Sequence, residues 1–251
     1  MEEIDEATLK VQVGSEKKSH KMNEKAKKLT AYHEAGHAVS SYYLKDHDPV
    51  KEISIIPRGM GAGGYTWYTP QEENYNSKAD MLEDLVSLLG GRVAEALSLH
   101  DISTGASNDL QRATSICRDM VSKYGMSDEL GPAAYSDDNN EVFLGKDYGH
   151  VNNYSEATSA RIDEQIEKMM RSAYAKTEDI LKTHYDKLEL VAETLIEKEK
   201  ISGNEFKQLM ENGFIADNKA DDKETENSEA EDKEAQNVDN ENDSASNEQK
   251  D

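Results

Sequence analysis

The residues most suited to chemistry in this sequence are two histidines one helical turn apart. His33-Glu34-Ala35-Gly36-His37 lies inside a helical pattern, so both imidazoles project from one face and can share a Zn²⁺ ion. Glu34 lies about 100° round the helix from His33, within reach of a metal-bound water without being a ligand. The arrangement is typical of zinc-assisted hydrolysis: the metal activates the water and polarises a carbonyl, while Glu34 takes the proton and passes it to the leaving amine.

A catalytic zinc site also needs a third protein ligand. A third histidine on the same helix is excluded, because Ser40 and Tyr43 occupy the positions three and six residues after His37. The candidates are therefore acidic residues elsewhere in the chain: Glu72, Glu73, Glu83, Glu95, Asp101 and Asp109. Spacing alone does not choose among them.

Helices must position most of these side chains. The first strong helix is predicted to end near Leu44, and its core-facing stripe consists of Leu29, Tyr32, Ala35, Gly36, Val39 and Tyr43. Capping signals and apolar periodicity predict further helices over Ser77–Leu99, Asn108–Lys123 and Ser155–Glu199, the last broken near His184, and a short helix capped by Ser202. Gly90-Gly91 within a helix is locally costly and indicates close helix packing rather than chemistry.

A small sheet is expected beside these helices. Val50–Ile56 and Tyr65–Thr69 have the composition of strands and flank a glycine-rich loop, and residues 142–144 have room for a third short strand. The predicted fold class is mainly α with a small β-sheet, an α+β domain built around the His-Glu-x-x-His helix.

Composition excludes several functions. The 251 residues include 52 acidic and 29 basic ones, a net charge of −23, which argues against nucleic acid as a partner. Cys117 is the single cysteine, so a disulfide scaffold is impossible. The last 36 residues hold 14 acidic and 4 basic side chains and no aromatic residue, which predicts a disordered acidic tail over 216–251. Without a long apolar run or a signal-peptide pattern, we expect a soluble, cytoplasmic chain.

A series of motifs resembles the protease domain of the FtsH family of membrane-tethered AAA+ zinc proteases. The resemblance extends from about Ala7 to Met210. The motifs are His33–Ala38, Pro57–Gly59, Gly63–Thr66, Leu89–Glu95, Ser103–Leu110 and Gly125–Ser127. On this resemblance, Asp109 completes the zinc site, Glu95 orients a ligating histidine, and Gly64, Tyr65 and Thr66 belong to an edge strand that binds extended substrate by main-chain hydrogen bonds.

The resemblance also implies a setting for the domain. Residues 1–23 would be the end of an ATPase-module helix and a linker, residues 24–215 the zinc peptidase domain, and residues 216–251 the tail. The expected partners are unfolded polypeptide substrates, five further copies in a homo-hexamer, and the AAA+ ATPase module and membrane anchor of a full-length parent at the cytoplasmic face of the cell membrane. The sequence contains neither an ATP-binding loop motif nor a hydrophobic span, so we expect a fragment beginning at an artificial Met1; a standalone peptidase is the alternative.

Two other functions compete with a zinc endopeptidase. One is a non-catalytic ring-assembly module with a structural zinc, although structural zinc normally has four protein ligands and often several cysteines. The other is a zinc hydrolase acting on bonds other than peptide bonds.

Overall fold

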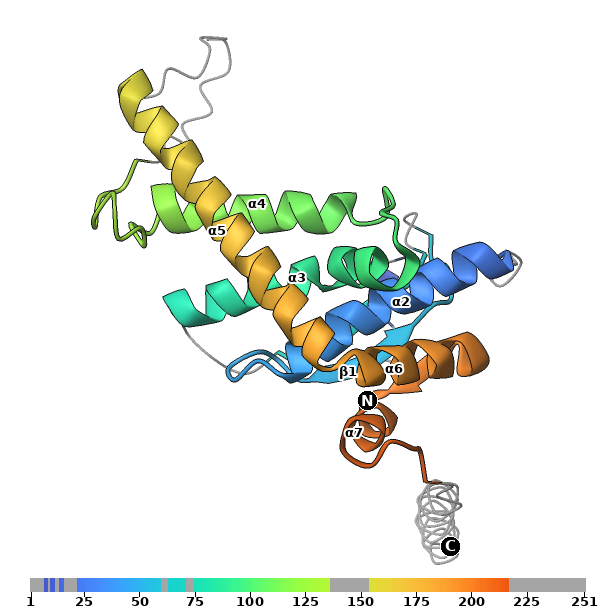
Figure 1. Ribbon diagram of the computed structural model, residues 1–251. Helices are drawn as coiled ribbons and strands as arrows, with labels where there is room; N and C mark the ends of the chain where they lie inside the picture. Colours follow the sequence, from blue (N-terminus) through green and yellow to red (C-terminus); the bar gives the residue numbers. More distant parts are fainter. Residues whose placement is uncertain are drawn as a thin grey trace, which may run out of the picture. The chain divides into compact units, whose positions relative to one another are not determined.

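The computed structural model describes residues 7–8, 10–11, 14–15, 22–59, 63–70, 75–135 and 154–216. The chain divides into two compact units, Met1–Gly213 and Phe214–Asp251, and every helix and strand named below lies in the first. That unit is mostly helical with one three-stranded antiparallel sheet (Figure 1), which confirms the predicted fold class. The candidate third strand at residues 142–144 lies outside the described residues.

The helix that carries both histidines, α2 (Glu24–Tyr42), lies at the centre of this unit. It begins at Asn23, whose side chain accepts a hydrogen bond from the Ala26 amide, as expected for an N-cap. All residues from Thr30 to Ser41 are buried, because α2 packs against α3, α6 and the sheet on different sides. The predicted single apolar stripe is therefore only part of its buried surface, and Tyr43, predicted to face the core, is 36% exposed.

The sheet has the order β2-β1-β3, formed by Tyr65–Tyr68, Val50–Ser54 and Lys200–Ser202. Thr66 of β2 pairs with the fully buried Ile53 of β1, which fixes the register of β2. In the described part of the chain no strand pairs with the outer edge of β2. The sequence did not predict β3, because this strand has only three residues, the last of which is the capping residue Ser202, and it pairs with a strand far away in the chain.

The remaining helices follow one another along the chain in the order predicted from the sequence. A capping box between Ser77 and Asp80 begins α3, and a break at His184 separates α5 from α6. The His184 ring stacks on Tyr43 at a centroid distance of 3.6 Å. The helices are α3 (Lys78–Leu99), α4 (Ser107–Ser122), α5 (Glu156–Thr183), α6 (Tyr185–Lys198) and α7 (Gly203–Asn212).

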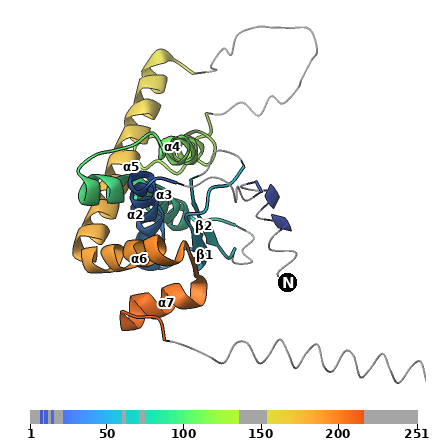
Figure 2. The same ribbon diagram turned by 90° about the vertical axis from the view of Figure 1, so that its right-hand side faces the viewer.

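The core contains buried apolar side chains from all the helices named above and from the sheet. Figure 2 shows α5 on one side of α2 and α3, and β1 and β2 on the other. Apolar side chains of α3, α4 and α5 form one cluster, which includes Leu85, Leu89, Met120 and Ile162. Further buried apolar side chains lie on α2, β1, α6, β3 and α7: Val39, Ile53, Leu188, Leu195, Ile201 and Phe206. No helix in the described ranges is long and apolar enough to cross a membrane.

Two glycines let α2 and α3 touch backbone to backbone. A Cβ atom on Gly36 would lie 2.4 Å from the carbonyl oxygen of Gly90, and one on Gly90 would lie 2.5 Å from the carbonyl oxygen of Gly36. Both distances are far below van der Waals contact, so only glycine fits at this crossing. Because Gly36 lies between His33 and His37, the crossing presses the histidine face of α2 against α3.

Candidate metal centre

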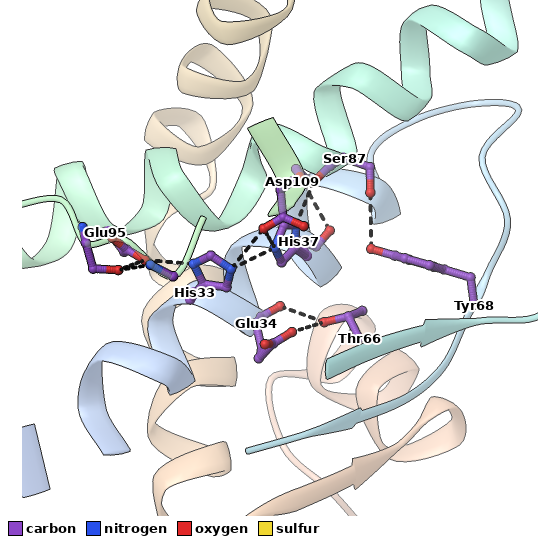
Figure 3. A network of polar contacts seen from close by, with 11 residues as sticks. His33, Glu34, His37, Thr66, Tyr68, Ser87, Glu95 and Asp109 are labelled. Carbon is purple, nitrogen blue, oxygen red and sulfur yellow. Dashed lines mark hydrogen bonds and ion pairs between the residues drawn. The ribbon is translucent and has the colours of Figure 1, made fainter. Parts of the chain in front are cut away.

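Three side chains from two distant parts of the chain converge at one point. His33 and His37 of α2 meet Asp109, which lies in the first turn of α4 (Figure 3). One potential ligand atom from each residue lies within 4.8 Å of the other two. Among the described residues this is the one group of three or more His, Cys, Asp or Glu side chains that meets this criterion.

The hydrogen bonds behind the two imidazoles determine which nitrogens face inwards. His33 Nδ1 lies 2.7 Å from the Glu95 carboxylate, and His37 Nδ1 lies 2.8 Å from the main-chain carbonyl oxygen of Ser87. Neither partner can donate, so each Nδ1 carries the proton and donates it. The Nε2 atoms of both rings are then directed at each other and at Asp109, the orientation that metal-ligating histidines adopt.

The separations of the inward-facing atoms suit a tetrahedral cation. His33 Nε2 lies 3.1 Å from His37 Nε2, and Asp109 Oδ2 lies 3.4 Å and 3.6 Å from these two nitrogens. Two ligand atoms about 2.0–2.1 Å from a tetrahedral zinc ion are roughly 3.3 Å apart. These three residues therefore fit a zinc ion with little rearrangement and leave a fourth position for another ligand.

The electrostatics of this group favour bound positive charge. Burial by itself would lower the pKa of His33, but hydrogen bonds to Asp109 and Glu95 outweigh it and raise the pKa to about 10. Burial would raise the pKa of Asp109, but hydrogen bonds to the two histidines hold it well below its usual range. Asp109 is thus an anion under ordinary conditions, and the site attracts a proton or a metal cation.

Glu34 points towards β2 (Figure 3). It is buried, and its Oε2 accepts a hydrogen bond from the Thr66 hydroxyl at 3.0 Å (Figure 3). Burial raises the pKa of the Glu34 carboxyl, while the neighbouring histidines and Thr66 oppose that rise. A carboxylate with a raised pKa is a stronger base than an ordinary surface glutamate.

Glu95 ties two ligand-bearing segments together. Its side chain is fully buried. Besides His33, it accepts hydrogen bonds from the amide and the hydroxyl of Ser103, at 2.6 Å and 3.0 Å. Ser103 belongs to the loop that leads into α4 and Asp109. One carboxylate therefore holds the His33 ring and the start of the segment that presents Asp109, and these bonds lower its pKa against the opposing effect of burial.

Gly91 is a site residue whose role the sequence did not reveal. A Cβ atom at this position would lie 2.5–2.6 Å from three atoms of the His33 ring. The backbone of α3 therefore lies flat against the face of the imidazole. The sequence predicted that both glycines allow close helix packing. This prediction holds for Gly90, which meets α2, whereas Gly91 makes room for the His33 ring at the candidate metal centre.

The structure separates the other candidate ligands from this centre. Glu83 accepts hydrogen bonds from the main-chain amides of Lys45 and Asp46, in the loop after α2. Asp101 is exposed and accepts a hydrogen bond from the Ile102 amide. Glu72 and Glu73 lie outside the described residues.

Two further contacts, both made by Ser87, were not predicted from the sequence. The Ser87 carbonyl has no sequence signal, because any residue at that position offers the same atom. The Ser87 hydroxyl lies 3.1 Å from the hydroxyl of Tyr68, whose pKa burial raises to about 12, so the phenol stays neutral. The only indication in the sequence was the alternation of Thr66 and Tyr68 on one face of a strand.

A cavity of about 760 Å³ opens over these residues. Its walls come from α2, α3, the start of α4 and the strand β2, and they include all three residues predicted to contact substrate, Gly64, Tyr65 and Thr66. The Tyr65 hydroxyl is bonded to Glu52 and Arg58 on the other side of the strand. The cavity thus joins the candidate metal centre to the strand β2.

Comparison with known proteins identifies the family of the chain. The sequence profile described as peptidase family M41 matches residues 20–209, a span that includes the three candidate metal ligands and all residues that line the cavity. The chain belongs to peptidase family M41. This confirms the resemblance to FtsH proteases on which the expectation for Asp109 rested.

Several M41 relatives are similar over most of this chain. It is 56% identical to the ATP-dependent zinc metalloprotease FtsH of Caldicellulosiruptor bescii, over 84% of this chain and 34% of the relative. It is 53% identical to the ATP-dependent zinc metalloprotease FtsH 1 of Thermoanaerobacter sp., over 83% of this chain and 34% of that protein. It is 42% identical to the ATP-dependent zinc metalloprotease FtsH of Thermotoga maritima, over 85% of this chain and 35% of that protein. The chain spans about a third of the length of these M41 proteins.

Proposed function

We propose that this M41 domain is a zinc-dependent endopeptidase that hydrolyses peptide bonds of unfolded polypeptides. The observation that carries the proposal is the convergence of two histidine Nε2 atoms and one aspartate oxygen beside a buried glutamate. The names of the M41 relatives, which are zinc metalloproteases, support it.

His33, His37 and Asp109 would hold the zinc ion. A bound zinc ion lowers the pKa of water towards 7 and polarises a carbonyl group. Because the ion would replace the proton on His33, whose pKa is raised to about 10, affinity for zinc should increase with pH below that value. Glu95 and the Ser87 carbonyl keep the two rings in the ligating orientation.

Glu34 would act as the general base. It lies on α2 next to a ligand, and its carboxylate faces the cavity wall formed by β2. It would take a proton from the attacking water and deliver it to the nitrogen of the leaving amine. Neither histidine is needed for that transfer, since both are occupied at Nδ1 and directed inwards at Nε2.

The substrate would bind as an added strand along Gly64, Tyr65 and Thr66. The outer edge of β2 carries main-chain groups without a partner strand in the described ranges, and it borders the cavity. Main-chain pairing recognises extended polypeptide largely regardless of its side chains. A folded protein cannot offer such a segment, so the substrate class would be unfolded or threaded chains.

The relatives suggest a larger assembly. They are described as ATP-dependent and are about three times as long as the segment they share with this chain. We propose that residues 24–215 are the peptidase domain of such a protein, with an AAA+ module and a membrane anchor in the full-length parent and a cytoplasmic location for this domain. A homo-hexamer would place the site inside a ring that folded proteins do not enter.

Metal content and cleavage of an unfolded substrate test the proposal together. The purified chain should bind one zinc ion and cleave casein but leave a folded protein of similar size intact. Removal of zinc with a chelator should abolish cleavage, and added zinc should restore it. A chain that binds zinc tightly but cleaves no polypeptide would contradict the proposal and favour a ring-assembly module.

The role of Glu95 can be tested separately with Glu95→Gln. His33 donates to Oε1 of Glu95 and the Ser103 amide donates to Oε2, so the NH₂ group that replaces one of these oxygens in glutamine would face a donor. We expect zinc affinity to fall about tenfold and the unfolding free energy to fall by about 1–3 kcal/mol, because a buried donor loses its partner. Competition with a chromogenic chelator and urea unfolding measure the two effects. Unchanged zinc affinity would mean that Glu95 has only a structural role.

A further inference from the structure

Thr66 makes a contact that binding substrate through the main chain does not require. Its hydroxyl oxygen lies 3.0 Å from Glu34 Oε2 and 3.2 Å from the main-chain oxygen of the same residue. Within the described part of the chain, no other side chain donates a hydrogen bond to the Glu34 carboxylate. Figure 3 shows Thr66 reaching from its strand directly to Glu34.

The strand is held close enough to make this contact by two further features. Thr66 pairs with Ile53, which is fully buried, so its backbone cannot move freely. Gly64 lies against the base itself: a Cβ atom there would be 3.0 Å from Glu34 Cγ and 2.6 Å from the Ser54 carbonyl oxygen. With no side chain at position 64, nothing separates the edge strand from Glu34.

We propose that Thr66 is the positioning residue of the general base, and that the substrate-binding strand itself thereby aligns Glu34. This inference rests on the proposed peptidase function and adds to it. An extended polypeptide that pairs with the edge of β2 would bind to the same strand whose side chain holds the carboxylate. One strand would then both bind the substrate and hold the base in position.

A hydroxyl group is suited to this task because it both donates and accepts. While Glu34 is ionised, the Thr66 proton is donated to Oε2. Once Glu34 has taken a proton from water, the Thr66 proton can turn to the Glu34 main-chain oxygen, and the hydroxyl oxygen can accept from the carboxylic acid. The two acceptors at 3.0 Å and 3.2 Å allow this exchange without movement of either backbone.

Thr66→Val and Thr66→Ser test the proposal. Valine retains the shape and the strand preference of threonine but removes the hydroxyl, whereas serine retains the hydroxyl. We expect kcat for casein to fall about tenfold to a hundredfold in the valine variant, as for loss of a hydrogen bond to a charged group. KM and zinc content should be unchanged, and serine should restore kcat to within about threefold. Thr69→Val is the matched control, since Thr69 is exposed and directly follows the same strand.

Crystal structures of the wild type and the valine variant provide a readout that needs no activity. We expect one ordered Glu34 conformer beside Thr66 in the wild type and a rotated or multiply placed carboxylate in the variant. An unchanged Glu34 in Thr66→Val would overturn the proposal, as would equal kcat in the valine variant and the wild type. A wild type without zinc-dependent cleavage would instead contradict the proposed function, while the Glu34 conformers would still decide the role of Thr66.

A double variant separates positioning of the base from binding of substrate. If Thr66 acts through Glu34, adding Thr66→Val to Glu34→Gln should change the residual kcat little, because residues that act as a unit are not additive. A further loss of the full tenfold to hundredfold would show that Thr66 acts on the substrate and not on the base.

Discussion

Glu34→Gln is expected to lower kcat/KM for casein roughly 10²-fold to 10⁴-fold while zinc remains bound. The amide has nearly the size of the carboxylate and can still accept the hydrogen bond that Thr66 donates to Oε2. It cannot take a proton from water at neutral pH. Since Glu34 is not one of the three converging residues, the metal centre should keep His33, His37 and Asp109 unchanged.

The measurement combines steady-state kinetics with zinc analysis of the same sample. Glu24→Gln is the matched control, because Glu24 lies on the same helix but is exposed in its first turn. The control should retain both activity and metal. Equal cleavage by Glu34→Gln and wild type would exclude Glu34 as the base, and loss of zinc from Glu34→Gln would show that the carboxylate supports the metal rather than the proton transfer.

Gly91→Ala is expected to reduce zinc affinity by about a hundredfold, the upper end for residues that support metal ligands. The new methyl group would lie 2.5–2.6 Å from three atoms of the His33 ring, so the ring must move. Its Nδ1 is bonded to a carboxylate that is itself fixed by Ser103, and the ring therefore cannot shift without losing that bond. Cleavage at limiting zinc should fall in parallel.

Gly90→Ala is the matched control, one residue away on the same helix. Its methyl group would meet the Gly36 carbonyl oxygen at 2.5 Å and the Ser40 hydroxyl at 2.6 Å. It should push α2 and α3 apart and cost about 1–3 kcal/mol of unfolding free energy, as overpacking does. Chelator competition and urea unfolding of both variants would distinguish the two glycines. If Gly91→Ala bound zinc as tightly as the wild type, the ring would not be constrained by α3.

Local sequence signals predicted the helical framework well. The capping boxes at Ser77 and Ser202, the break at His184 and the strand pattern before Pro57 each depend on residues a few positions apart. The two histidines belong to the same class, because a spacing of four within a helix places both side chains on one face wherever the helix lies. These features would be predicted from any sequence with the same local pattern.

Asp109 could not be selected as the third candidate ligand from local sequence patterns. The spacing of the acidic residues left several of them possible as the third ligand, and only the resemblance to FtsH proteases selected Asp109. The structure brings it to the two histidines because the loop from Ser103, held by Glu95, sets the start of α4. Contacts of this kind join segments whose separation in sequence has no fixed relation to their distance in space.

The sequence by itself determined that one helix carries two histidines and an acid in the arrangement of a zinc peptidase. Tertiary structure decided which atoms surround them: the Ser87 carbonyl behind His37, the Gly91 backbone against His33 and the Thr66 hydroxyl on Glu34. Each of these contacts depends on how α3 or β2 packs against α2. That packing is set by the buried side chains of the whole domain, so no local pattern in the sequence contains it.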